Sequence, residues 1–160
     1  MAAVLKKVLV LGMGNPQLQD DGIGMHVTRS FKSEFGSRPW FNIIDTAEVD
    51  LSLLPSIEDA DAVIVVAATE TGKRPGSVQV LRNEQFDQVL TRTRKENQDV
   101  SLRDLFAAAS IRGRCPSERV LIAVQPESVD QGDQPSKVVE KAIPRVCKAI
   151  DRISHTWLDD

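Results

Sequence analysis

The feature that most constrains the fold of this chain is the segment from residue 8 to residue 24, which reads VLVLGMGNPQLQDDGIG. Its apolar run, residues 8–11, predicts a strand that is buried on both faces of a parallel sheet. Glycines and Asn15 then surround two adjacent aspartates, Asp20 and Asp21, just before a helical pattern begins. Strand ends in an open α/β sheet form a crevice, so these carboxylates are candidates to face a ligand, a metal or a partner chain. The alternative is an acidic helix N-terminus that the helix dipole stabilises.

The same segment argues against dinucleotide binding. Gly12 and Gly14 follow a strand, but Gln17 stands where the third glycine of the dinucleotide fingerprint belongs, and Pro16 interrupts the turn. The two aspartates would also face a pyrophosphate group, which binds N–H donors and positive charge.

Length and charge restrict the remaining classes. A chain of 160 residues suits one domain, spanning 1–160, with one hydrophobic core. With 20 basic and 23 acidic residues and no basic stripe, it is not expected to bind nucleic acid. The sequence has neither a signal-peptide pattern nor an apolar run long enough for a membrane, which predicts a cytoplasmic protein with no membrane partner. Cys115 and Cys147 are then expected to be free thiols.

Strand patterns alternate with helix patterns along the chain. Apolar residues at helical spacing predict a helix over Ile23–Phe35 and a long helix over residues 136–157 that Pro144 kinks. The expected strands are 8–11, 42–45, 63–68, 77–81 and 119–124, and the expected shorter helices are 51–57, 84–89 and 102–109. This order predicts a three-layer α/β/α sandwich around a mostly parallel five-stranded sheet, with the functional edge at the strand carboxyl ends.

Four motifs, taken in order, resemble those of the nickel-iron hydrogenase maturation endopeptidases. They are the glycine and aspartate segment 12–24, the turn Pro75-Gly76, Asp104 within SLRDL, and QPES at 125–128. The resemblance extends over roughly residues 7–150. It implies an α/β protease that recognises nickel already inserted in a hydrogenase large-subunit precursor and then removes a short C-terminal extension.

The resemblance also implies three metal ligands, of which this chain keeps one. Asp21 falls on the first ligand position, an acid in the glycine segment. Ala67 occupies the second position, where the family has an aspartate at the end of the third strand, and Gln98 occupies the position of a histidine. Such nitrogen and oxygen donors suit nickel. The candidates for substrate contact are Asn15, Asp20 and Asp45.

Other acids could extend the incomplete ligand set, namely Glu48, Glu70 and Asp99. A site of carboxylates alone, built around Asp21, would favour hard cations rather than nickel. The two histidines are not expected to replace the missing ligands. His26 is expected on a different helix face from Asp21, and His155 is expected in solvent near the C-terminus.

Three hypotheses about function follow from these residues, and the first two assign no catalytic residue. The first is an active maturation endopeptidase, in which either the placement of Ala67 or Gln98 at a ligand position is wrong or the nickel is weakly bound or brought by the precursor. The second is a non-catalytic homologue that binds the precursor, or another protein, as a chaperone, scaffold or regulator; the loss of two ligands favours it. The third is a small-molecule enzyme that uses Asp21, Asp45 and Glu70 as general acid and base.

Overall fold

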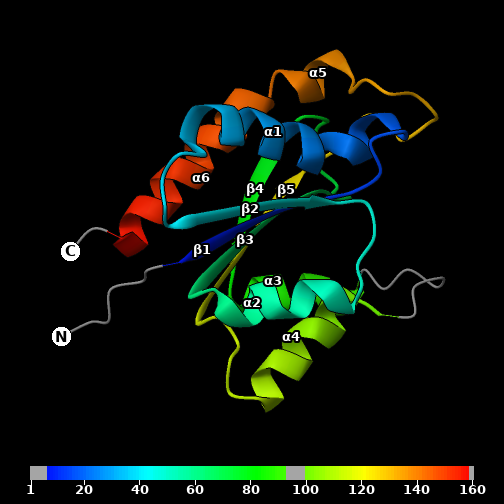
Figure 1. Ribbon diagram of the computed structural model, residues 1–160. Coiled ribbons are helices and arrows are strands. Elements are labelled where there is room, and N and C mark those ends of the chain that lie inside the picture. The colour runs from blue at the N-terminus through cyan, green and yellow to red at the C-terminus, as the bar shows by residue number, and fades with distance from the viewer. Residues whose placement is uncertain (1–6, 93–99, 159–160) are drawn as a thin grey trace.

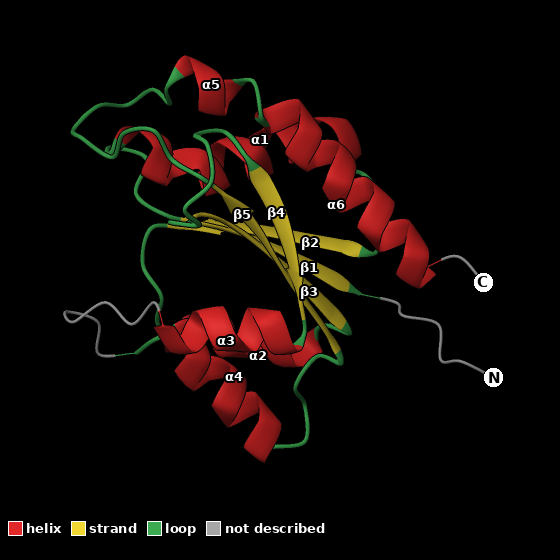
Figure 2. Cartoon of the chain, turned by 180° about the vertical axis from the view of Figure 1, so that it is seen from behind, coloured by secondary structure: helices red, strands yellow, loops and turns green. Residues whose placement is uncertain are grey.

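The computed structural model of the chain describes residues 7–92 and 100–158. A five-stranded sheet lies between two layers of helices, as Figures 1 and 2 show, which confirms the predicted α/β/α sandwich. The strands are β1 (Val8–Met13), β2 (Phe41–Thr46), β3 (Ala62–Ala68), β4 (Val78–Arg82) and β5 (Glu118–Val124). The helices are α1 (Ile23–Phe35), α2 (Leu54–Asp59), α3 (Glu84–Arg92), α4 (Leu102–Ile111), α5 (Lys137–Glu140) and α6 (Ile143–Leu158), with short 3-10 turns η1 (Gln19–Gly22) and η2 (Leu51–Leu53).

The central strands are apolar throughout because helices cover both of their faces. In β1, Val8 and Val10 belong to the core cluster beneath α1 and α6, whereas Leu9 and Leu11 belong to the cluster on the side of α2, α3 and α4. Alternate residues of β3 and β5 divide between the two clusters in the same way. Within the described residues, no helix is both long enough and apolar enough to span a membrane.

The order of the strands creates a crevice between β1 and β3. The sheet order is β2-β1-β3-β5-β4, with β4 antiparallel to β5 and the other neighbours parallel. From β1 the chain passes through α1 on one face of the sheet, whereas from β2 to β3 it passes through α2 on the other face (Figure 1). The order of the strands therefore reverses at β1, with β2 on one side of it and β3 on the other, and ligands bind at such a switch point in open α/β sheets.

One sequence prediction about the helices is wrong. Residues 136–157 form two helices, α5 and α6, rather than one long kinked helix. Pro144 is the second residue of α6 and does not kink a continuous helix. In the first turn of a helix the missing N–H of proline removes no hydrogen bond, so Pro144 is compatible with the start of α6.

Candidate functional site

A cavity of about 370 Å³ occupies the switch point between β1 and β3. Most of its wall is apolar, with side chains from the ends of β1 and β3, the loop after β2, and helices α3 and α4. Three charged residues line it: Asp21, Glu70 and Arg103. Its apolar walls include Met13, Val49, Ala67, Leu90, Leu102 and Leu121. A peptide segment placed here would contact apolar side chains on several sides and carboxylates from two different loops.

Asp21 reaches this cavity because its backbone is pressed against Gly14. Gly14 has a φ of 128°, and a Cβ atom there would lie 1.8 Å from the backbone oxygen of Asp21. Only glycine fits this close approach. The Asp21 carboxylate then accepts a hydrogen bond at Oδ2 from the backbone N–H of Asn15, at 2.9 Å. The glycine turn thus fixes both the backbone and the carboxylate of Asp21.

Asp20 lies away from the cavity, although it is adjacent to Asp21 in sequence. Its side chain is fully buried. Oδ2 accepts hydrogen bonds from the backbone N–H groups of Glu127 and Ser128, at 2.8 and 3.0 Å, and from Ser136 Oγ at 2.8 Å. Oδ1 accepts one from the Ser136 backbone N–H at 2.6 Å. Asp20 therefore holds together the two ends of the loop between β5 and α5.

The stability of the protein is expected to fall in acid because of Asp20. Burial raises the pKa of Asp20, but hydrogen bonds from Ser128, Ser136 and Glu127 outweigh burial and lower the pKa below its ordinary value of 3.8. A carboxyl whose pKa is lower in the folded state stabilises the fold above its unfolded pKa and loses that contribution as the pH falls through the folded pKa. Urea unfolding followed between pH 7 and pH 3 should show stability decreasing below about pH 4. An Asp20→Asn variant should show a shallower decrease; equal pH dependence in both proteins would contradict this assignment.

The other two candidates for substrate contact also lie outside the lining of the cavity. Asn15 Oδ1 accepts a hydrogen bond from the backbone N–H of Gln17, at 2.9 Å, so this side chain closes the turn in which it lies. Asp45 lies near the end of β2 on the face that α1 covers, and Arg29 of α1 pairs with it at 4.0 Å. The structure therefore brings Asp21 to the cavity and leaves Asn15, Asp20 and Asp45 around it.

Of the positions considered as metal ligands, Ala67 and Glu70 join Asp21 at the cavity. Ala67 offers only a methyl group. Glu48 lies in the exposed loop after β2 and is not part of the lining. Gln98 and Asp99 lie outside the described residues. Among the residues that the structure describes, no group of three or more His, Cys, Asp or Glu side chains is placed to hold a metal ion. The described residues therefore do not provide the ligand set of a resident nickel site.

Neither histidine takes part in the cavity lining. His26 lies on α1, with its Nε2 buried and without a hydrogen-bond partner among the described residues. Burial lowers the pKa of His26, and the charge of Arg29 lowers it further, against an opposing effect of Glu140. His155 lies 3.4 Å from Asp151 on α6. Neither position adds a histidine to the lining beside Asp21, as expected.

Two polar residues next to the cavity have roles that the sequence reasoning missed. Asp104 of the SLRDL motif forms a capping box with Ser101, in which the Asp104 carboxylate accepts from the Ser101 backbone N–H at 2.9 Å. This cap fixes the first turn of α4, which contributes Leu102 and Arg103 to the cavity wall. Gln125 of the QPES motif hydrogen-bonds to Glu70. The sequence feature that could have indicated a role for Gln125 is its position directly after a buried strand, at the functional edge of the sheet.

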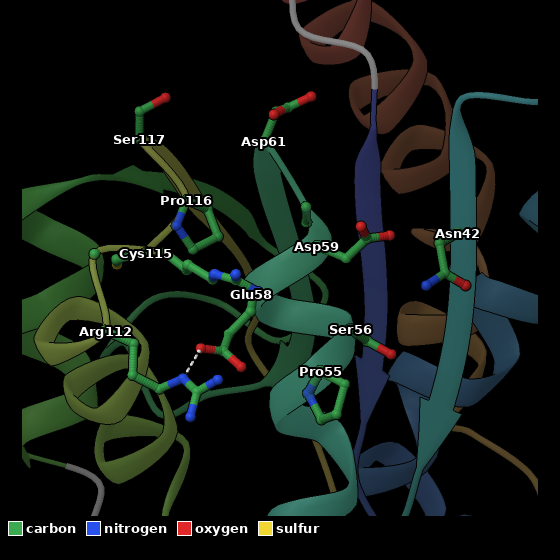
Figure 3. A pocket seen from close by; sticks show the side chains of 13 residues that line it. Asn42, Pro55, Ser56, Glu58, Asp59, Asp61, Arg112, Cys115, Pro116 and Ser117 are labelled. Atoms are coloured by element: carbon green, nitrogen blue, oxygen red, sulfur yellow. Dashed lines mark hydrogen bonds and ion pairs between the residues drawn. The ribbon is translucent and has the colours of Figure 1, made fainter.

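A larger cavity, of about 960 Å³, lies at the opposite edge of the sheet, where β3 and β5 begin. Figure 3 shows Arg112, at the end of α4, reaching toward Glu58 of α2 across this cavity; the two side chains pair at 2.6 Å. The Asp59 carboxylate pairs with Lys7 at 2.7 Å. Because these charges are already paired, and because ligands in such sheets bind at the carboxyl ends of the strands, the smaller cavity is the better candidate site.

Comparisons with known proteins agree on one family. A sequence model described as hydrogenase maturation protease (HycI) matches residues 25–153. Hydrogenase 2 maturation protease of Escherichia coli (strain K12) is 28% identical over 149 residues, and the match covers 90% of this chain and 90% of that protein. The hydrogenase expression/formation protein HupD of Rhodobacter capsulatus is 29% identical over 125 residues; the match covers 78% of this chain but only 60% of that relative. The chain therefore spans about three fifths of the length of this HupD protein.

The fold agrees with a solved structure from the same group. The hydrogenase maturating endopeptidase HybD from E. coli superposes with a TM-score of 0.82 at 25% sequence identity, over 90% of this chain and 89% of that chain. The similarity therefore extends over most of the chain.

Proposed function

Because this chain belongs to the hydrogenase maturation protease family, we propose that it is an endopeptidase that removes a C-terminal extension from a hydrogenase large-subunit precursor. The observation that supports this reaction best is the apolar cavity at the switch point, with the Asp21 carboxylate fixed at its wall. The apolar walls can accept the peptide segment on either side of the scissile bond and exclude water around it. Asp21 is the group proposed to contact the reacting part of the precursor.

Nickel enters this proposal as part of the substrate. The described residues do not form a resident nickel site, so the precursor would carry the metal to the cavity. Hydrolysis by a Ser or Cys nucleophile with a histidine base is not supported, because the described lining contains no histidine and no cysteine. A carboxylate that holds and deprotonates a water molecule is the chemistry that this lining supports. We place the reaction in the cytoplasm, where Cys115 and Cys147, both free thiols in the structure, remain reduced.

The proposal is tested by incubating the protein with the large-subunit precursor from the same organism, prepared with nickel and without it. The intact mass of the precursor is then followed over time. We expect a loss of mass that corresponds to a C-terminal fragment, and only in the nickel-loaded precursor. A precursor that is bound but never shortened would contradict the proposal and support the non-catalytic homologue.

A further inference from the structure

Gln125 is a buried amide whose hydrogen-bonding groups are all used. Its side chain lies just past the end of β5, and the residue is only 5% exposed. Oε1 accepts hydrogen bonds from the Thr71 backbone N–H at 2.7 Å and from Thr71 Oγ1 at 2.9 Å. Nε2 donates to Glu70 Oε2 at 3.0 Å and to the Pro126 carbonyl at 3.2 Å. Reversal of the amide would place Nε2 against an N–H donor and Oε1 against a carboxylate, so the chemistry allows one orientation.

This amide fixes Glu70, which follows β3 and lines the same cavity as Asp21. Glu70 is exposed, and a long exposed side chain would otherwise sample many rotamers. The bond from Gln125 occupies Oε2 of Glu70, whereas Oε1 has no hydrogen-bond partner among the described residues. A carboxylate oxygen is thereby left open at the cavity. Ala67, three residues earlier, has no side-chain oxygen to offer there.

We propose that Gln125 is a positioning residue that holds Glu70 at the cavity, so that Glu70 and Asp21 together contact a cationic group of the precursor. This inference rests on the proposed function and assigns the second contact carboxylate to Glu70 instead of the missing acid at position 67. The lining has two carboxylates and one guanidinium, that of Arg103, so its net charge is negative and favours a cation. The cationic group is either the metal that the precursor carries or a basic side chain near the scissile bond.

The experiment is a double-mutant cycle with Glu70→Gln, Gln125→Met and the combined variant, measured as kcat and KM for precursor cleavage. Glu70→Gln removes the charge, whereas Gln125→Met removes the hydrogen bonds with little change in volume. We expect each single variant to lose roughly 10- to 100-fold in kcat/KM, as is common for groups that orient a contact residue. The loss should appear mainly in KM, because a contact made equally with bound substrate and transition state contributes to binding.

The combined variant distinguishes positioning from a merely structural role. If Gln125 acts through Glu70, the combined variant loses no more than the worse single variant, whereas independent effects would multiply. Glu48→Gln removes an exposed loop acid outside the lining and should cleave as the parent does. Circular dichroism at the assay temperature shows whether Gln125→Met is folded. Should Gln125→Met fail to fold, the Glu70→Gln comparison still decides whether this carboxylate contacts the precursor.

Two forms of the precursor separate the two sources of positive charge. Because only the nickel-loaded form is expected to be cleaved, the dissociation constant for each form is measured by a binding titration. A loss of affinity in Glu70→Gln that is confined to the nickel-loaded form identifies the metal as the contact, and an equal loss with both forms identifies a basic side chain. If the parent cleaves and Glu70→Gln cleaves equally well, this inference is overturned while the proposed function remains. If the parent does not cleave at all, both are overturned together.

Discussion

Replacement of Asp20 by Asn is expected to lower the free energy of unfolding by about 3 kcal/mol, because it disrupts charge-assisted hydrogen bonds to a buried group. The Asp20 carboxylate accepts four hydrogen bonds, three of them from backbone N–H groups. An amide can present only one oxygen, so at least one buried N–H group would face the new NH2 group without an acceptor. Total stabilities of roughly 5–15 kcal/mol make this a large loss. Urea unfolding at pH 7, followed by circular dichroism, measures it.

The adjacent aspartate provides the matched control. Asp21 accepts a single hydrogen bond from a backbone N–H and lies at the wall of an open cavity, so Asp21→Asn should change stability by less than about 1 kcal/mol. A difference between the two variants would separate the structural acid from the acid that faces the cavity. Equal stabilities would show that the loop between β5 and α5 does not depend on Asp20.

The sequence predicted the sheet well because its signals are local. Apolar runs that lack alternation, as in β1 and β3, are typical of strands buried on both faces of a parallel sheet, and such sheets have helices on both sides. The helix Ile23–Phe35 was predicted with the observed bounds. Its apolar residues Ile23, Val27 and Phe31 recur at a spacing of four and are all fully buried.

The interruption between α5 and α6 could not be read from the same periodicity. The residues at 136–157 keep one apolar face across the break, since Val139, Ala142 and Val146 all join the core beneath α1. A hydrophobic pattern records which residues are buried, not whether the backbone between them is a continuous helix. Pro144 did signal a discontinuity. Because proline is compatible with the first turn of a helix, it lies at the start of α6 and does not kink a continuous helix.

The difference between Asp20 and Asp21 also lies beyond sequence patterns. Both acids fit the same helix start, but within the short turn η1 Asp20 is buried whereas Asp21 lines the cavity. Asp20 accepts hydrogen bonds from the loop between β5 and α5, which is more than a hundred residues away in sequence. The hydrogen-bond partners of Asp20 are therefore set by tertiary structure, and they cannot be predicted from residue spacing within the segment 12–24.

Removal of the Asp21 carboxylate is expected to lower kcat/KM for precursor cleavage by at least about 100-fold, the size of effect that removal of one preorganised polar group produces in other enzymes. In Asp21→Ala the cavity keeps its apolar walls but loses the carboxylate that is fixed beside Gly14. Without this group, the cavity has no fixed anion on the β1 side to attract a cation or to hold a water molecule. The rate of appearance of shortened precursor, measured by intact mass, gives the result.

Asp45→Asn is the control for that measurement, since Asp45 is an acid near the end of the neighbouring strand that lies outside the cavity lining. Asp45→Asn removes the same charge from the same edge of the sheet. If the activity depended only on the total negative charge at this edge, both variants would therefore lose activity alike. We expect Asp45→Asn to cleave within a few-fold of the parent, which would also end its candidacy for substrate contact. If Asp45→Asn loses as much activity as Asp21→Ala, the substrate extends across β2, and the site is wider than the cavity between β1 and β3.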